Sequence, residues 1–203
     1  MGIVKPLPTG RLAGKRLGIL LESGYVEEEI AYYQRRFAEE GAEVTLLTRL
    51  WGLSSITFTG QGHQAPLTVE GDLEAVDFHE LLQYSALIVP SGLVAERLRY
   101  SEDVEQISPA LELLRRAFRV PSVLKAFSCH GLQLLSAAPE LLRDRPVTCH
   151  NNVAGDVRNM GAVYLNQDLV VDRDLITSRT VEHCHLLART VIERLDIPAR
   201  AAA

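Results

Sequence analysis

Short apolar runs alternate with longer amphipathic segments along the chain. Apolar runs bounded by glycine, proline or polar turns are typical of strands buried in a sheet, and apolar residues three or four positions apart are typical of helices. Strands are expected at 16–21, 42–50, 86–90, 123–128 and 145–149, and a hairpin at 163–172 and 175–178. Helices are expected at 27–40, 78–83, 132–138 and 180–195, and at 101–118 in two pieces with a break near Pro109. A turn or short helix is expected at 156–161.

This alternation predicts an α/β fold with a mostly parallel sheet. The first strand, the first helix and the second strand form one βαβ unit, and such crossovers are right-handed and join parallel strands. Residues 51–72 are polar and interrupted by glycines, and we expect a small hairpin or an edge excursion there. The 203 residues, 47% of them hydrophobic, suffice for the core of one domain. We therefore expect an irregular arm at 1–15, a single domain at 16–197 and a tail at 198–203.

Charge and cysteine content narrow the class of protein. The net charge of −5 and the lack of a long basic cluster argue against nucleic acid or an anionic membrane surface as the main partner. Cys129, Cys149 and Cys184 form an odd set without paired spacing, which favours a reducing compartment, the cytoplasm. The first residues lack the apolar core of a signal peptide, and no apolar run is long enough to span a bilayer. No cluster has zinc-ligand spacing, so we expect neither a metal nor a cofactor.

Cys129 lies where a buried strand is expected to turn sharply into a helix. The apolar run after Pro121 ends at Ser128, and apolar residues at helical spacing resume after Gly131. A nucleophile at such a turn is pushed out of the sheet, and the free N–H groups of the new helix favour a thiolate beside them. The alternative is an ordinary buried cysteine that packs as a small hydrophobe. We interpret Cys129 as a reactive thiol.

Four motifs, in order, resemble the PfpI intracellular protease family, which includes the Parkinson-associated protein deglycase. They are Ala126-Phe127-Ser128-Cys129-His130-Gly131 around the thiol, Tyr25-Val26-Glu27-Glu28-Glu29-Ile30 at the start of the first helix, Val89-Pro90-Ser91-Gly92 followed by Glu96-Arg97, and the late pair Ser178-Arg179. The resemblance covers roughly residues 16–195. It implies a flavodoxin-like three-layer α/β sandwich of the class I glutamine amidotransferase-like type.

The resemblance also implies a site around the Cys129 thiol. Glu29 would project from the first helix onto the sulfur, where a protonated carboxyl group can donate a hydrogen bond and lower the thiol pKa. His130 would act as the base, with Glu96 supplied by a neighbouring subunit of a homodimer or larger homo-oligomer. The alternatives are a solvated acidic first turn for Glu29, a turn histidine bonded to backbone for His130, and a surface ion pair for Glu96.

Donors for an oxyanion complete the implied site. The backbone N–H groups of Gly92 and His130 are the expected pair, and Ser91 stands where the family often has a second glycine, which restricts the loop more. His150 corresponds to a histidine near the pocket in the deglycase relatives, or else caps the end of a strand. Arg179, from the Ser-Arg pair, is expected to bind substrate.

Together these residues imply a cofactor-free cysteine hydrolase or lyase acting on small carbonyl, amide or peptide substrates, of the peptidase, amidase, glyoxalase or deglycase type. The rival hypothesis is a redox-sensing stress-response protein or chaperone in which Cys129 is oxidised to a sulfinate and no substrate is turned over. A third is a catalytically idle domain that works by dimer contacts. Leu132 replaces a proline common after Cys-His-Gly, and residues 181–183 replace a proline-containing stretch. Both are expected to shape the rim of the pocket, which leaves the substrate open.

Overall fold

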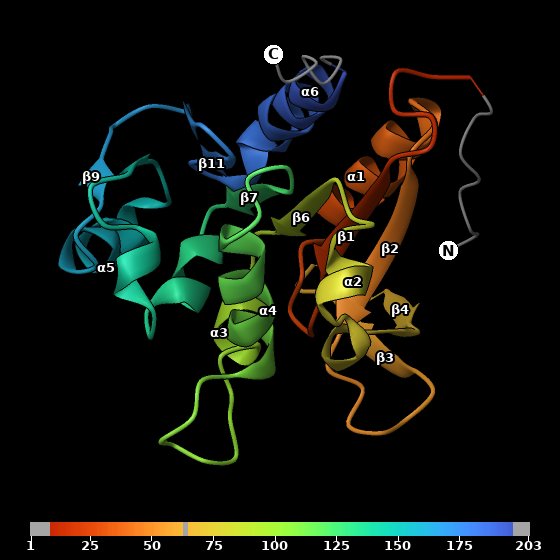
Figure 1. Ribbon diagram of the computed structural model, residues 1–203, viewed down its shortest axis with the longest axis horizontal. Coiled ribbons are helices and arrows are strands. Elements are labelled where there is room, and N and C mark those ends of the chain that lie inside the picture. The colour runs from red at the N-terminus through yellow and green to blue at the C-terminus, as the bar shows by residue number, and fades with distance from the viewer. Residues whose placement is uncertain (1–8, 63–64, 197–203) are drawn as a thin grey trace.

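A mostly parallel sheet forms the centre of the molecule. The computed structural model describes residues 9–62 and 65–196, and within these ranges the strands of the main sheet follow the order β10-β11-β7-β6-β1-β2-β5 (Figure 1). All neighbours are parallel except β10, which runs antiparallel to β11. The strands are β1 (Arg16–Leu20), β2 (Glu43–Thr48), β5 (Gly71–Asp72), β6 (Ala86–Val89), β7 (Leu124–Ser128), β10 (Leu169–Asp172) and β11 (Leu175–Ser178).

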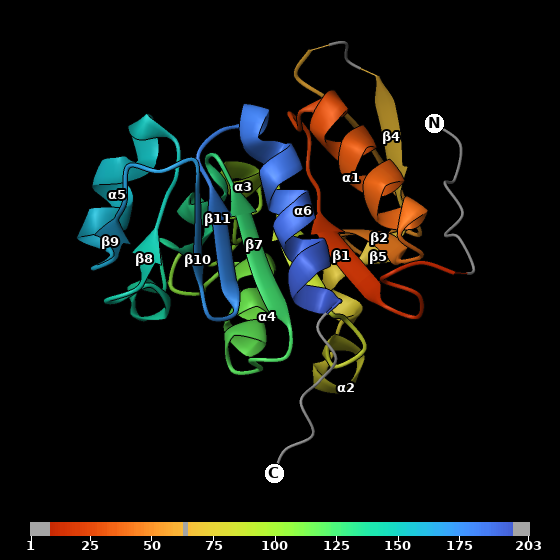
Figure 2. The ribbon, with the colours of Figure 1, turned by 90° about the horizontal axis from the view of Figure 1, so that it is seen from above.

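Helices cover both faces of this sheet. On one face α1 (Glu27–Glu39) and α6 (Cys184–Leu195) pack side by side, and on the other face lie α4 (Pro109–Phe118) and the short α3 (Val94–Arg97) (Figures 1 and 2). A further short helix, α2 (Phe78–Leu81), precedes β6. The expected flavodoxin-like three-layer α/β sandwich is confirmed.

The core sits between these layers because the central strands are apolar on both faces. Every residue of β6 and β7 is buried, as is usual for parallel strands that carry helices on each side. From α1, Ile30, Tyr33 and Phe37 are buried at helical spacing. The same periodicity that predicts the helix therefore also determines which of its faces meets the sheet.

Smaller elements flank the sheet at both ends. The hairpin expected within 51–72 is confirmed by antiparallel β3 (Ile56–Thr59) and β4 (Pro66–Val69), with β5 added at the sheet edge. At the other end, β8 (Pro146–Val147) pairs in parallel with β9 (Val163–Tyr164), next to α5 (Ala154–Asn159).

The prediction of one continuous strand at 163–172 is wrong, because the structure has two separate strands there. Its first part belongs to β9, and only β10 pairs with β11 around the turn at Arg173, whose φ is 55°. Polar residues between the two parts bend the chain, because the Thr148 hydroxyl donates to the Gln167 carbonyl at 2.6 Å and the Gln167 N–H donates to the Leu165 carbonyl at 2.9 Å. The break allows each part to pair with a different strand.

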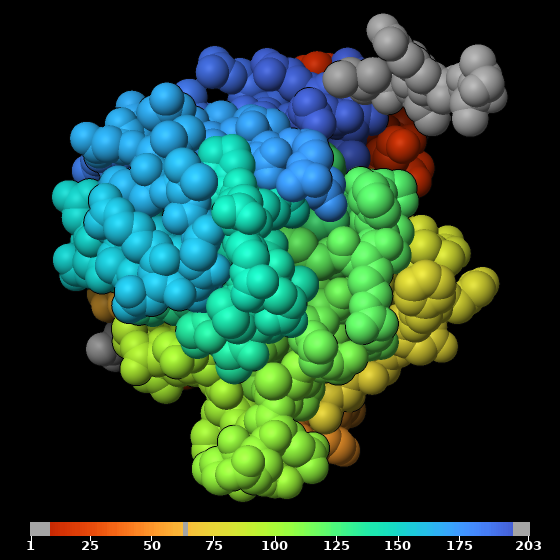
Figure 3. Space-filling model, turned by 60° about the vertical axis from the view of Figure 1, so that its left-hand side comes forward, coloured from red at the N-terminus to blue at the C-terminus, as the bar shows by residue number. Residues whose placement is uncertain are grey.

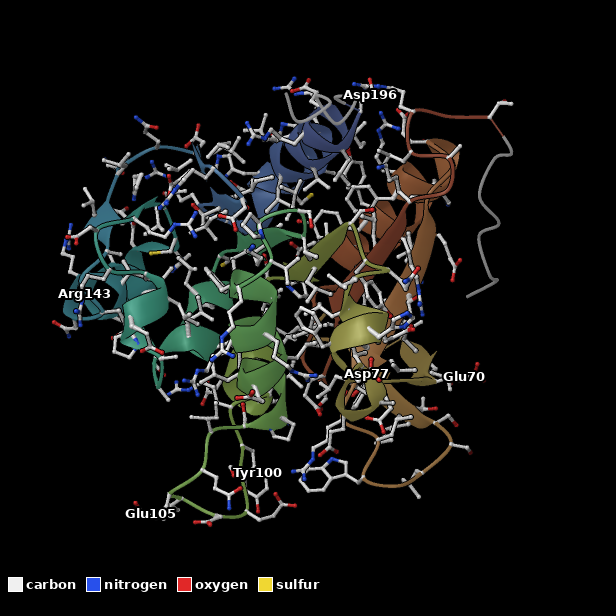
Figure 4. The ribbon with its side chains drawn as sticks, in the orientation of Figure 1. Glu70, Asp77, Tyr100, Glu105, Arg143 and Asp196 are labelled. Atoms are coloured by element: carbon white, nitrogen blue, oxygen red, sulfur yellow. The ribbon has the colours of Figure 1, made fainter. Side chains whose placement is uncertain are left out.

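The expected helix at 101–118 is too long, because α4 begins only at Pro109. The hydroxyl of Ser108 caps the helix by accepting from the Leu111 N–H at 3.3 Å, and proline suits the first helical position because it has no N–H to leave unpaired. The preceding residues form a segment that projects from the body of the molecule (Figures 1 and 3), and Figure 4 shows Tyr100 and Glu105 on it.

Two more helix predictions need correction. The segment expected as a helix at 132–138 is a 3₁₀-helix at Gly131–Leu135, followed by a second 3₁₀ turn that starts at Pro139. Since Pro139 lacks an N–H, an α-helix cannot continue through it. The last helix starts at Cys184, after a 3₁₀ turn at Val181–His183, and not at 180.

The described part of the N-terminal arm packs against the domain. Leu12 is fully buried, and its N–H donates to the Glu40 carbonyl at 2.7 Å. The rest of the expected arm and the expected tail at 198–203 lie outside the described residues.

A buried ionic network ties β7 to the β10–β11 hairpin. Lys125 is fully buried, and its ammonium group donates to the carbonyls of Ala117 and Val120, each at 3.2 Å, and to the carboxylate of Asp174. Arg145 donates to Asp174 at 2.8 Å and is ion-paired with the hairpin residue Asp172 at 2.6 Å. Charges removed from water are tolerated only when they are paired in this way.

Asp174→Ala should therefore destabilise the protein strongly. The substitution leaves the Lys125 ammonium buried without its counter-charge, which costs about 3 kcal/mol of the free energy of unfolding. Adding Lys125→Met should restore much of that loss. Urea denaturation of the single and double variants measures both effects, with Arg11→Ala in an exposed ion pair as the control that changes little. A loss no larger in Asp174→Ala than in the control would contradict the argument.

Candidate active site around Cys129

Cys129 occupies a sharp turn directly after β7. Its φ is 57°, in the left-handed region that residues other than glycine rarely adopt. Two backbone bonds hold it there, since its N–H donates to the Ser178 carbonyl at 3.0 Å and its carbonyl accepts from the His150 N–H at 3.1 Å. The turn expected at this position is present, and it places the thiol at the end of the sheet where β6, β7 and β11 terminate.

A cavity of about 580 Å³ opens above the thiol. It lies at the carboxyl ends of the parallel strands, where the loops that follow them converge. Its lining residues are Val26, Gln61, Ser91, Gly92, Leu93, Glu96, Cys129, His130, Gln133, His150, Asn152, Thr180, Val181 and Glu182. Six of the eight predicted site residues are therefore brought together at one cavity, while Glu29 and Arg179 do not line it.

Gly92 is one of the residues that line this cavity. Its φ is +87°, and a Cβ placed there would lie 2.4 Å from the Gly24 carbonyl oxygen. The next residue, Leu93, donates its N–H to the same oxygen at 3.0 Å. Glycine is required because the loop after β6 passes directly against the loop after β1.

Glu29 lies buried beneath the cavity, in the first turn of α1. Only 1% of its surface is exposed. Its Oε1 accepts from the Tyr33 hydroxyl at 2.8 Å, and its Oε2 accepts from the Ser91 N–H at 2.8 Å. Burial raises the pKa of Glu29, although these hydrogen bonds oppose the shift. The alternative of a solvated acidic turn fits Glu28, which is exposed, but not Glu29.

The carboxylate of Glu29 acts on the thiol through its charge. Among the described residues no hydrogen bond joins it to Cys129 Sγ. Burial, and then the charge of Glu29, raise the pKa of Cys129 to about 11, opposed by the N–H of His130, the hydroxyl of Ser91 and the N–H of Val181. A charged Glu29 thus has the opposite effect on the thiol from the protonated Glu29 that the sequence suggests.

The imidazole ring of His130 lies beside the thiol of Cys129. Its Nδ1 lies 3.2 Å from Cys129 Sγ, and its ring stacks on His150 with centroids 4.7 Å apart and planes at 24°. Burial and the neighbouring His150 lower the pKa of His130, while Glu96 raises it. A neutral ring accepts the thiol proton at Nδ1 only as the tautomer that carries hydrogen on Nε2.

His150 and Glu96 frame the opening of the cavity. The Nδ1 of His150 accepts from the Asn152 N–H at 3.2 Å, so the neutral ring carries its hydrogen on Nε2. This bond caps the short 3₁₀ turn that follows, whereas the alternative given for His150 was a cap at the end of a strand. Glu96 is exposed and lines the same cavity as His130 within one chain. A Glu96 supplied by a neighbouring subunit stays a prediction.

Two predicted contributions to the pocket lie elsewhere. Arg179 is bonded to Asn166 at 2.6 Å and ion-paired with Asp168 at 3.4 Å, so its guanidinium group braces the connection before β10. Leu132 is 1% exposed and packs into the core, because it is held inside the 3₁₀-helix after Cys129. The rim that Leu132 was expected to shape is formed partly by Val181 and Glu182.

Sequence reasoning expected residues 181–183 at the pocket but missed Thr180 just before them and the roles of the serines beneath the thiol. Thr180 lines the cavity because β11 ends beside β7, a neighbour relation set by the sheet order. Ser128 and Ser178 are buried partners in the register of β7 and β11. A signal was available, since serines at the ends of two otherwise apolar strands are buried polar groups that must be hydrogen-bonded.

Neither a metal site nor a membrane helix is found in the part of the chain that the structure describes. Within residues 9–62 and 65–196, no three histidine, cysteine or acidic side chains are grouped so that they could hold a metal ion. Over the same ranges, no helix combines the length and apolar character needed to cross a bilayer.

Comparison with known proteins identifies the family. A model of the DJ-1/PfpI family matches residues 15–194. General stress protein 18 of Bacillus subtilis is 28% identical over 90% of this chain and 99% of its own, and protein/nucleic acid deglycase 2 of Escherichia coli is 27% identical over 89% and 98%. A solved two-domain protein of Anabaena variabilis, with DJ-1/ThiJ/PfpI-like and ferritin-like domains, has a TM-score of 0.78 at 24% identity over 89% of this chain and 48% of that one. This chain belongs to the DJ-1/PfpI family.

Proposed function

We propose that the protein is a cysteine-dependent hydrolase or lyase that acts on carbonyl adducts, small carbonyl compounds, amides or peptides. The observation that carries the proposal is the Cys129 thiol, held at a sharp turn in the cavity, with its sulfur 3.2 Å from His130 Nδ1. The deglycase name of the Escherichia coli relative favours carbonyl adducts of amines within this range.

The first chemical step makes the thiolate. The thiol proton passes from Cys129 Sγ to His130 Nδ1, and the sulfur lone pair forms a bond to the substrate carbonyl carbon while the carbonyl π electrons move to oxygen. For an amide or a peptide, the carbonyl then re-forms, the C–N bond breaks, and the leaving nitrogen takes the proton from His130. Water adds to the resulting thioester, which releases the carboxylic acid and regenerates the thiol.

Backbone donors around the sulfur suit the developing oxyanion. The N–H groups of His130 and Val181 lower the pKa of Cys129, so both favour negative charge on the sulfur. Gly92 lines the same cavity and adds the donor expected from the sequence. The Nε2–H groups assigned to His130 and His150 are further donors for a carbonyl or carboxylate of the substrate.

The charge of Glu29 limits how readily the thiolate forms. Two negative charges close together in a buried site repel each other strongly, so the ionised Glu29 raises the pKa of Cys129. Protonation of Glu29, whose own pKa is raised by burial, relieves this repulsion. The pair therefore carries one negative charge more easily than two, and its titration is coupled.

The homo-oligomer and the cytoplasmic location are proposals as well. The homo-oligomer is supported by the family resemblance, and the location by the three cysteines without paired spacing.

A second candidate function is redox sensing at Cys129. It is favoured by the place of Cys129 in the lining of the cavity and by the stress-protein name of the Bacillus subtilis relative. Mild peroxide followed by intact and peptide mass analysis separates the two functions. A sensor gains oxygen selectively at Cys129 and changes its binding partners, whereas an enzyme only loses activity.

Cys129→Ser should abolish turnover. A serine hydroxyl fits the same turn but ionises far less readily, so we expect a loss of about a thousandfold or more. The measurement is turnover of methylglyoxal, of its adducts with N-acetyllysine and N-acetylcysteine, and of an unstructured peptide. Cys184→Ser, which lies outside the cavity, is the control and should keep its activity. Unchanged turnover of whichever of these substrates the wild type consumes would exclude the mechanism.

Glu29→Gln should lower the pKa of Cys129. The amide removes the charge and still accepts from the Ser91 N–H through Oε1, while its NH₂ group donates to the Tyr33 hydroxyl. Because the thiolate fraction below the pKa changes tenfold per unit, alkylation of Cys129 by iodoacetamide between pH 7 and 10.5 should be roughly tenfold faster. Glu28→Gln on the exposed side of the turn is the control. An unchanged or slower rate in Glu29→Gln would refute the charge argument.

A further inference from the structure

Three buried serine hydroxyls form a line beneath Cys129. Ser91, Ser128 and Ser178 come just after β6, at the end of β7 and at the end of β11, and each is 1% exposed. The register of the sheet places Ser178 directly beside Ser128. Hydroxyl groups so far from water must be satisfied within the protein, so their hydrogen bonds have to be accounted for one by one.

The hydrogen bonds of these serines have a direction. The Ser178 hydroxyl donates to Ser128 Oγ at 3.1 Å, and Ser128 Oγ lies 2.9 Å from Ser91 Oγ. Because Ser128 already accepts from Ser178, its single hydrogen has two acceptors, Ser91 Oγ and the Glu29 carboxylate, whose pKa both serine side chains lower. When it goes to Ser91, the Ser91 hydroxyl keeps its own hydrogen, with the Cys129 sulfur and Glu29 as the acceptors.

The position of Ser91 decides where that hydrogen goes. The Ser91 N–H is anchored to Glu29 Oε2 at 2.8 Å, and the residue lines the cavity together with Cys129. The Ser91 side chain also lowers the pKa of Cys129, which fits a donor close to the sulfur. A chain of aligned donors strengthens each hydrogen bond along it.

We propose that the Ser91 hydroxyl donates a hydrogen bond to the Cys129 thiolate, and that Ser128 and Ser178 are positioning residues that orient it. The proposal deepens the proposed function, on which it rests, because it explains how the thiolate forms beside the charge of Glu29.

Removal of the hydroxyl should make the thiolate harder to form. A hydrogen bond to a charged group is worth more than one to a neutral group, so Ser91 favours the thiolate over the thiol. Ser91→Ala and Ser91→Gly both keep the Ser91 N–H that donates to Glu29. Each removes the Ser91 hydroxyl, and with it the hydrogen bond to Ser128. Either variant should raise the pKa of Cys129 by about one unit.

The test is the pH profile of Cys129 alkylation by iodoacetamide between pH 7 and 10.5, followed by peptide mass analysis, which needs no turnover. Ser91→Ala and Ser91→Gly should react roughly tenfold more slowly at each pH below the thiol pKa. Ser91→Thr, which keeps the hydroxyl, should react close to the wild-type rate, and Ser178→Ala should be slowed in the same direction by less. Ser23→Ala removes a hydroxyl bonded to Glu22 on a neighbouring loop and should leave the profile unchanged.

Two results would overturn the proposal. One is a wild-type profile in Ser91→Gly and Ser91→Ala, which would mean that the hydroxyl does not act on the sulfur. The other is an equal loss in Ser91→Thr, which would assign the effect to the shape of the loop. Failure of the proposed function is recognised separately, since it would be seen as turnover retained by Cys129→Ser whatever the alkylation profiles.

Discussion

The burial of Glu29 next to the Cys129 thiol is the constraint on which the site depends. The carboxylate connects the first turn of α1 to the loop after β6, because it accepts from Tyr33 on its own helix and from the Ser91 N–H. Both donors are neutral, so they stabilise the charge without cancelling it. The same group therefore fixes the geometry of the loop and sets the electrostatic cost of making a thiolate beside it.

The charged groups at the two ends of the central strand β7 are compensated in different ways. At its amino end Lys125 and Arg145 neutralise Asp174 in a closed network, which serves the stability of the fold. At its carboxyl end the two acidic groups Glu29 and Cys129 interact and have neutral donors around them, and the pKa of each is raised chiefly by burial. Binding of a proton by Glu29 or Cys129 therefore removes negative charge at that end. Groups that gain and lose protons in this way are what acid–base chemistry at a thiol requires.

Features determined by local sequence could be predicted, and features determined by long-range packing could not. The apolar run before Cys129 and the glycine after His130 predict the turn at the thiol, and the periodicity of α1 predicts which face is buried. The 3₁₀-helix after Cys129 was missed because apolar spacing does not distinguish it from an α-helix, although Pro139 limits its length. Arg179 was placed at the site by resemblance alone, whereas its partners lie on a connection whose path no local pattern reveals.

Membership of the family determines the sheet order and the turn at Cys129, but it leaves the surroundings of the sulfur open to variation. Ser91 illustrates this, because its N–H donates to Glu29 while its side chain adds a hydroxyl beside the cavity. Ser128 and Ser178 can orient that hydroxyl only because β7 and β11 are neighbours in register. In our proposal the reactivity of the thiol is adjusted from inside the core, while loop residues such as Leu93 and Glu182 line the cavity that would receive a substrate.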